Sequence, residues 1–261
     1  RDADKSPVLE CIDLGITFGG LKAVDNFNVT IGRTEITGLI GPNGAGKTTV
    51  FNLLTKVYQP THGTILLNGK DIHDLNTAQV NRAGIARTFQ NIRLFGELSV
   101  EENITVAMDT QMHYTMPEGI FRLPRFWKEE RIVHERAMEL LSIFHMEDLA
   151  KAKASSLPYG AQRRLEILRA LATNPSLLLL DEPAAGMNPS ETAELMENIR
   201  SIRDTFKIAV LLIEHDMNLV MNICEGIAVL NFGHVIAKGT PEDIQNNPEV
   251  IEAYLGKQKE A

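Results

Sequence analysis

The stretch Gly41-Pro42-Asn43-Gly44-Ala45-Gly46-Lys47-Thr48-Thr49 decides how this sequence is read. It fits the phosphate-binding loop pattern G-x-x-x-x-G-K-[ST] at every fixed position. The apolar run before it, residues 36–40, predicts a buried strand, and residues 50–54 after it predict the beginning of a helix. A loop between a strand and a helix is the context that this motif requires.

The chemistry expected of this loop follows from its backbone. Glycines let N–H groups turn inward around phosphate oxygens, and the positive end of the following helix favours their negative charge. Lys47 can reach the β- and γ-phosphates of a nucleotide, and the Thr48 hydroxyl can hold Mg²⁺. The complete pattern disfavours the alternative, a glycine-rich turn without a ligand. The residues expected to contact the nucleotide here are Asn43, Gly44, Ala45, Gly46, Lys47, Thr48 and Thr49.

Composition limits the class of protein. The 261 residues suffice for one large domain, and a formal net charge of -8 with a pI of about 5.4 argues against a nucleic-acid module. No apolar run is long enough to span a bilayer, and the first residues resemble neither a signal peptide nor a transit peptide. Cys11 and Cys224 lack metal or redox spacing, so we expect unpaired core thiols in a reducing compartment.

Periodicity predicts an α/β order of elements. Residues 8–12, 27–31 and 64–67, with the turn Asn68-Gly69, suggest an antiparallel sheet beside the core. Residues 91–168 are expected to be mainly helical, with a helix over 130–144 and breaks at 116–119 and 123–124. Further predicted elements are helices over 157–173, 190–204 and 241–255, strands over 177–180 and 208–213, and a hairpin over 227–237.

Two carboxylates stand where a ligand is expected. Asp181 and Glu182 follow the apolar run 177–180, and ligands of open α/β sheets bind at the carboxyl ends of the strands. Asp181 suits the hydration shell of Mg²⁺, and Glu182 suits the role of a base for the attacking water. Alone, the pair is equally consistent with a solvated acidic loop; together with the loop at 41–49 it becomes a strong signal.

Three further side chains are candidates with open alternatives. Gln90 can ligate Mg²⁺ or the water, or it is an exposed amide. His215 follows a third apolar strand and can contact a γ-phosphate, or it is a satisfied surface histidine. Phe18 can stack on an adenine ring, although an isolated phenylalanine is more often part of the core.

The order of these features resembles the nucleotide-binding domain of ATP-binding cassette (ABC) transporters over nearly the whole chain. The distinguishing segment, Leu157-Pro158-Tyr159-Gly160-Ala161-Gln162-Arg163-Arg164, is similar to the signature region of that family. The resemblance implies that Phe18 stacks on adenine, Gln90 is the lid glutamine, Glu182 is the catalytic base and His215 is the switch histidine. It further implies that Thr48, Gln90 and Asp181 serve Mg²⁺, that Tyr159 and Gly160 contact nucleotide, and that Asn188 lies in a dimer-contact loop.

Other segments narrow the resemblance to ATPases of branched-chain amino-acid importers, and to their LivG-type more than their LivF-type subunits. They are residues 19–24, 87–95, 181–189 and 212–217, and the ending over 239–256. Urea and lipopolysaccharide transport ATPases share parts of these motifs. Two positions depart from the family signature, since Pro158 stands where serine is usual and Ala161 where glutamine is usual. Lys56 replaces a common glycine, and a cation suits the end of a helix.

The resemblance implies a P-loop NTPase core with an antiparallel β subdomain and a helical signature subdomain, in one ABC ATPase domain over 1–261 with the helical part at roughly 91–168. The expected cofactors are ATP and Mg²⁺. The expected partners are a LivF-type paralogue or a second copy in a head-to-tail dimer, two transmembrane permeases, and indirectly an extracytoplasmic solute-binding protein, without nucleic acid. The expected location is the cytoplasmic face of the cell membrane. The alternative class, an ABC ATPase of DNA repair or ribosomes, is disfavoured by a single P-loop and the absence of sustained heptads.

Overall fold

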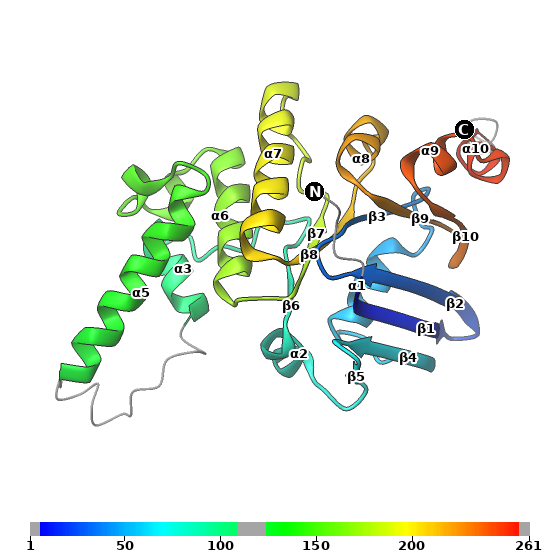
Figure 1. Ribbon diagram of the computed structural model, residues 1–261, viewed down its shortest axis with the longest axis horizontal. Coiled ribbons are helices and arrows are strands. Elements are labelled where there is room, and N and C mark those ends of the chain that lie inside the picture. Colours follow the sequence, from blue (N-terminus) through cyan, green and yellow to red (C-terminus); the bar gives the residue numbers. More distant parts are fainter. Residues whose placement is uncertain (1–5, 109–123, 256–261) are drawn as a thin grey trace. The chain divides into compact units, whose positions relative to one another are not determined.

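The computed structural model describes residues 6–108 and 124–255 (Figure 1). The expected break at 116–119 lies outside these residues. The chain divides into two compact units, one made of Arg1–Gln90 with Ser176–Ala261 and the other of Asn91–Pro175. Among the described residues, no helix is long and apolar enough to cross a membrane.

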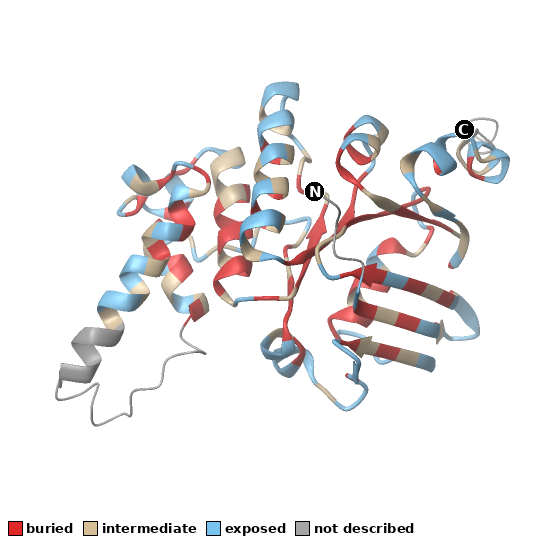
Figure 2. Ribbon diagram, in the orientation of Figure 1, coloured by how far each residue is buried: buried red, intermediate tan, exposed pale blue. Residues whose placement is uncertain are grey.

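The first unit contains a largely parallel sheet with the order β10-β9-β3-β8-β7-β6. Its strands are β3 (Ile36–Ile40), β6 (Ile85–Arg87), β7 (Leu177–Asp181), β8 (Ala209–Ile213), β9 (Gly226–Asn231) and β10 (His234–Gly239). Only β10 pairs antiparallel, with β9. Every residue of β3, β7 and β8 is buried, as expected for parallel strands covered on both faces, which confirms the strands expected from the apolar runs (Figure 2).

An antiparallel sheet in the same unit has the order β2-β1-β4-β5. Its strands are β1 (Pro7–Phe18), β2 (Leu21–Gly32), β4 (His62–Leu67) and β5 (Lys70–Asp71), and they lie side by side in Figure 1. The expected turn between β4 and β5 is confirmed, since Asn68 and Gly69 both have positive φ, 50° and 75°. Buried side chains of β1, β2, α1 (Lys47–Leu54), β3 and β8 form one hydrophobic cluster.

The second unit is helical, as expected. It contains α3 (Val100–Met108), α5 (Pro124–Ser142), α6 (Tyr159–Ala172) and two short 3₁₀ turns, Glu147–Leu149 and Ala154–Ser156. The helix expected over 130–144 begins earlier, at Pro124, because proline without an N–H is tolerated in a first helical turn. The unit, Asn91–Pro175, extends past the expected end at residue 168 because it includes the rest of α6.

The remaining helices belong to the first unit. They are α2 (Thr77–Ala83), α7 (Pro189–Phe206), α8 (Met217–Ile223), α9 (Pro241–Gln245) and α10 (Pro248–Leu255). Asn188 caps α7 as predicted, with its side chain accepting the Glu191 N–H. The tail expected to be helical over 241–255 is helical, in two pieces, because Pro248 lacks the N–H that would continue α9 into α10.

Both cysteines are free and buried, which confirms the expectation of core thiols. Burial raises the pKa of the Cys11 thiol to about 12 and raises the pKa of Cys224 as well. Both groups therefore remain neutral thiols at physiological pH.

Candidate functional site

The loop between β3 and α1 needs glycine at particular positions. Gly46 has a φ of 107°, and a Cβ there would lie 2.8 Å from the Ala23 carbonyl oxygen. A Cβ on Gly41 would lie 2.0 Å from the carbonyl oxygen of Leu230. The backbone thus approaches its neighbours too closely for any side chain, and the loop curves into the N-terminus of α1.

This loop forms one wall of a cavity of about 240 Å³. All seven loop residues expected to contact the nucleotide line it, and so do the predicted catalytic residues Glu182 and His215. Ile213, the last residue of β8, is a lining residue that the sequence did not single out. The lining residues are Asn43, Gly44, Ala45, Gly46, Lys47, Thr48, Thr49, Glu182, Ile213 and His215.

Lys47 places a positive charge at the centre of the loop. Its ammonium donates hydrogen bonds to the carbonyl oxygens of Gly41, at 2.6 Å, and of Pro42, at 3.1 Å. The side chain is buried. With the N–H groups at the beginning of α1, this ammonium forms a positive cradle that suits phosphate oxygens.

Glu182 is held by the two other predicted catalytic side chains. The Gln90 amide donates a hydrogen bond of 3.0 Å to Glu182 Oε2, and His215 Nε2 lies 2.7 Å from Glu182 Oε1. Glu182 itself has a φ of 48°, a left-handed backbone that turns the chain sharply after β7. The structure therefore brings together three residues that are far apart in the sequence.

The Glu214 carboxylate binds the backbone next to Glu182 and His215. Its two carboxylate oxygens accept the N–H groups of Ala184 and His215. Burial raises the pKa of Glu214, and the neighbouring Glu182 carboxylate acts in the same direction. Sequence reasoning assigned Glu214 no role, although it lies directly beside His215.

Asp181 ends β7 one residue before Glu182, and it is buried. One of its oxygens, Oδ2, accepts a hydrogen bond of 2.9 Å from Arg87. Within the described part of the chain, Oδ1 has no hydrogen-bond partner. Asp181 does not line the cavity but adjoins Glu182, which does.

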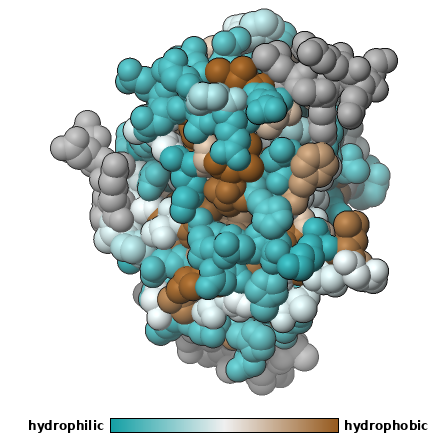
Figure 3. All heavy atoms as spheres, turned by 90° about the vertical axis from the view of Figure 1, so that its right-hand side faces the viewer, coloured by the Kyte–Doolittle hydropathy of each residue, from teal (hydrophilic) through white to brown (hydrophobic). Residues whose placement is uncertain are grey.

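Phe18 lies at the end of the β1–β2 hairpin and outside the lining of the cavity. Its ring is 43% exposed and meets the Tyr58 ring edge-on, with centroids 5.2 Å apart. The side of the molecule seen in Figure 3 shows apolar side chains gathered in a band between hydrophilic ones. An exposed, oriented ring is suited to stack on a flat apolar ligand, which a buried core phenylalanine is not.

The signature residues lie in the second unit. Pro158 is the N-cap of α6 and supplies no side-chain hydrogen bond, and the Gly160 N–H lies in the first turn. Tyr159 is 49% exposed, and Arg163 Nε donates a 3.2 Å hydrogen bond to its hydroxyl. The N-terminus of α6 is therefore capped by neither serine nor another polar side chain.

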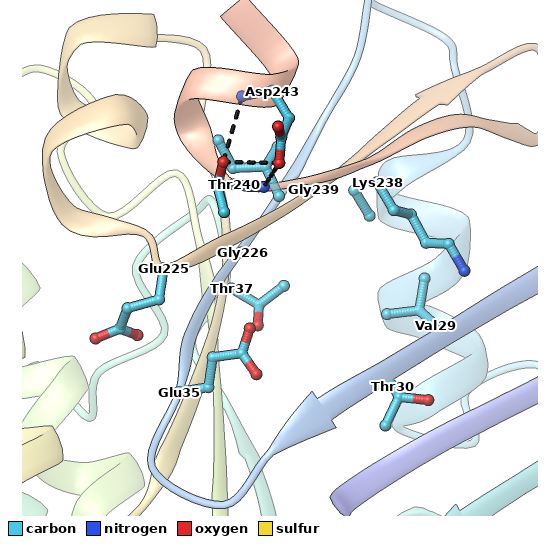
Figure 4. A pocket seen from close by; sticks show the side chains of 12 residues that line it. Val29, Thr30, Glu35, Thr37, Glu225, Gly226, Lys238, Gly239, Thr240 and Asp243 are labelled. Atoms are coloured by element: carbon cyan, nitrogen blue, oxygen red, sulfur yellow. Dashed lines mark hydrogen bonds between the residues drawn. The ribbon is translucent and has the colours of Figure 1, made fainter. Parts of the chain in front are cut away.

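A second cavity, of about 300 Å³, lies at the opposite end of β3 (Figure 4). Its charged groups have partners within the chain. Glu225 accepts hydrogen bonds from the Ile36 N–H and from Arg203, and Asp243 accepts hydrogen bonds from the N–H and hydroxyl of Thr240, the N-cap of α9. This cavity does not contain the phosphate-binding features of the first.

Two protein families match the chain. Residues 24–185, more than half of the sequence, match the family described as ABC transporter. Residues 234–260 match the family described as branched-chain amino acid ATP-binding cassette transporter. The second match contains β10, α9 and α10.

Curated proteins and solved structures resemble the chain over nearly its full length. The high-affinity branched-chain amino acid transport ATP-binding protein LivG of Escherichia coli K12 is 49% identical over 250 residues, with 96% of this chain and 98% of LivG covered. The corresponding protein BraF of Pseudomonas aeruginosa is 48% identical with the same coverage. The crystal structure of the ADP conformation of MJ1267, an ATP-binding cassette of an ABC transporter, has a TM-score of 0.83 and 30% identity, covering 97% of this chain and 100% of that one.

Proposed function

This chain belongs to the ABC transporter family of ATP-binding proteins, and from that membership we propose that it powers the import of branched-chain amino acids through separate permease subunits. It is an ATPase, because the proteins of this family hydrolyse ATP to drive transport. The observation that carries the catalytic assignment is the Glu182 carboxylate, held between Gln90 and His215 at the wall of the phosphate-binding cavity.

The geometry supports a division of labour among these residues. The loop N–H groups and Lys47 bind and orient the phosphates, and they lower the energy of the negative charge that builds up during phosphoryl transfer. Glu182 accepts a proton from the attacking water, and His215 and Gln90 hold its carboxylate in place. Phe18 stacks on the adenine, and Tyr159 and Gly160 at the beginning of α6 contact the nucleotide of the opposite subunit.

The residues present fit Mg²⁺. Mg²⁺ prefers oxygen donors and keeps several waters, so one or two protein groups and the phosphates suffice to hold it. Thr48 lines the cavity, and Asp181 has an oxygen without a hydrogen-bond partner among the described residues, so these two would hold the ion, with Gln90 contributing its amide oxygen. Bound there, Mg²⁺ supplies neutralisation of the β- and γ-phosphate charge.

ABC ATPases act as dimers with transmembrane permease components. We propose that the partner here is a LivF-type paralogue rather than a second copy, and that the pair lies on the cytoplasmic face of the membrane through two permeases. A solute-binding protein outside the membrane would deliver the amino acid. The close relatives named as branched-chain amino acid transport proteins support this assembly.

The C-terminal segment supports branched-chain amino acids over urea or lipopolysaccharide as the transported solute. Residues 234–260 match a family defined by branched-chain amino acid transport, whereas residues 24–185 match ABC transporters in general. The alternative class, an ABC ATPase that acts on DNA or ribosomes, is disfavoured by the net charge of -8. Cell fractionation tests that alternative. A transporter subunit follows the membranes through its permease, whereas the alternative follows nucleic acid or ribosomes.

Reconstitution tests the proposal. The chain, its partner ATPase and both permeases are placed in vesicles with the binding protein, and ATP-driven uptake of leucine and of urea is measured. We expect the wild-type complex to take up leucine. Glu182→Gln should reduce this uptake by about 10²–10⁴-fold, because loss of a general base slows hydrolysis by this factor, while ATP binding persists. A matched control, Glu252→Gln at an exposed position of α10, should transport normally. Urea uptake without leucine uptake would assign another solute, and near-normal ATPase activity of Glu182→Gln would overturn the role of Glu182.

A further inference from the structure

Arg87 joins three parts of the first unit through its guanidinium. Arg87 ends β6, and its Nη2 donates a 2.9 Å hydrogen bond to Asp181 Oδ2 at the end of β7. Its Nη1 donates a 2.7 Å hydrogen bond to the Asn52 side chain on α1, the helix that begins at the phosphate-binding loop. One side chain thus connects β6, β7 and α1.

The guanidinium is fixed by its surroundings as well as by these bonds. The side chains of Arg87 and Asp181 are only 6% and 5% exposed, so the ion pair is buried. The Arg87 guanidinium carbon lies 5.3 Å from the centre of the Phe51 ring and 4.8 Å from that of Phe89. Two rings and two oriented acceptors leave the planar group little freedom, which favours a defined geometry over a loose surface pair.

The pairing leaves Asp181 with one committed and one free oxygen. Oδ2 is occupied by Arg87, and within the described residues Oδ1 has no partner. Thr88, the next residue, has its hydroxyl 3.4 Å from the Asp181 N–H.

We propose that Arg87 is a positioning residue for Asp181: it holds the carboxylate turned so that Oδ1 serves the Mg²⁺ of the nucleotide complex. The inference rests on the proposed function, because it assigns Asp181 to that ion. Arg87 itself does not line the nucleotide cavity. Groups that orient a metal-binding residue in this way typically contribute about 10- to 100-fold to metal affinity.

The experiment measures binding, apart from turnover. A fluorescent ATP analogue is titrated into the purified chain without Mg²⁺, and then at fixed nucleotide with increasing Mg²⁺. For Arg87→Met we expect unchanged affinity without Mg²⁺ and a half-saturating Mg²⁺ concentration about 10- to 100-fold higher. Arg87→Lys, which retains the charge but cannot reach Asn52 and Asp181 together, should give a smaller increase. If Arg87→Met does not fold, the Mg²⁺ titration of Arg87→Lys tests the inference by itself.

Two comparisons separate positioning from general stability. In Arg203→Met, a partly buried arginine that pairs with Glu225 outside the nucleotide cavity is lost, so thermal stability should fall while the Mg²⁺ dependence stays that of the wild type. In an Asp181→Asn background, Arg87→Met should add no further loss, because its target is gone. Wild-type Mg²⁺ dependence in both Arg87 variants would overturn the inference. Absence of any nucleotide binding in the wild-type chain would instead contradict the proposed function.

Discussion

Single side chains determine what the cavity can do chemically. Glu182 by itself would be an ordinary carboxylate at a strand end; Gln90 and His215, on its two oxygens, give it a fixed orientation. Lys47 is likewise fixed, by two carbonyl oxygens of its own loop. Preorganised groups of this kind lower the barrier because little reorganisation is needed when charge develops.

The raised pKa of Glu214 predicts a pH dependence of stability at this site. The folded protein binds the Glu214 proton more tightly than the unfolded chain does, so above the ordinary pKa of 4.5 the contribution of Glu214 to stability falls until the raised pKa is passed. Glu214→Gln cannot ionise. We expect its free energy of unfolding, relative to that of the wild type, to increase as the pH rises from the ordinary pKa of 4.5 toward the raised pKa of Glu214.

Urea unfolding of both proteins at several pH values measures this difference. The Gln variant loses one acceptor for the N–H of Ala184 or His215, which adds an offset that does not change with pH. A difference that is flat over the whole range would contradict the assignment of the raised pKa to Glu214.

At the scale of elements, two helices are each followed by a lysine with a left-handed backbone, and these two lysines differ in burial. Lys56 after α1 has a φ of 57° and is buried, and among the described residues its ammonium has no hydrogen-bond partner. Lys207 after α7 has a φ of 53° and is exposed. Burial lowers the pKa of Lys56, while the charges of Asp71 and Asp74 oppose this.

We therefore expect Lys56→Met to stabilise the protein by about 1 kcal/mol, since it removes a buried, unpaired donor and keeps the aliphatic part of the side chain. This corresponds to an increase in Tm of about 2–4 °C for a domain of this size. Lys207→Met should change the free energy of unfolding by less than about 0.5 kcal/mol. Calorimetry of both variants decides the matter. A loss of stability in Lys56→Met would show that the end of α1 and the two aspartates stabilise the cation.

At the scale of the whole molecule, Pro158 predicts unequal ATP sites in the transporter. Proline at the N-cap of α6 offers neither hydroxyl nor N–H to a phosphate of the opposite subunit. A hydrogen bond to a charged group contributes about 1.5–3 kcal/mol, so the site served by this signature should be weakened by roughly ten- to a hundred-fold. The Gly160 N–H and the positive end of α6 remain, so the site should not be inactive.

If the partner ATPase has serine at that position, Glu182 of this chain faces the better signature. Inactivating Glu182 should then reduce the ATPase activity of the complex more than inactivating the partner's equivalent glutamate, and Pro158→Ser should narrow the gap. ATPase rates of the reconstituted complex, with one glutamate replaced at a time, measure this. Equal losses and no response to Pro158→Ser would mean that the surrounding loop compensates.

Local sequence alone determined the elements and the class of chemistry. The apolar runs became β3, β7 and β8 because strands buried on both faces need continuous hydrophobic residues. The phosphate-binding loop was readable because its fixed residues form a local pattern between a strand and a helix, although the atoms that exclude a Cβ at Gly41 and Gly46 belong to the distant residues Leu230 and Ala23. Asn188 with Pro189 likewise marked the beginning of α7.

Only the tertiary structure decided which side chains meet. From its chemistry alone Gln90 favoured an exposed amide, and His215 was equally readable as a surface histidine. The neighbouring β6, β7 and β8 bring both side chains to Glu182. Arg87 was part of a family-like motif with no assigned task until the register placed it against Asp181, 94 residues further along the chain. Periodicity reports what one segment buries; contacts between distant segments depend on strand order and register, which no local pattern encodes.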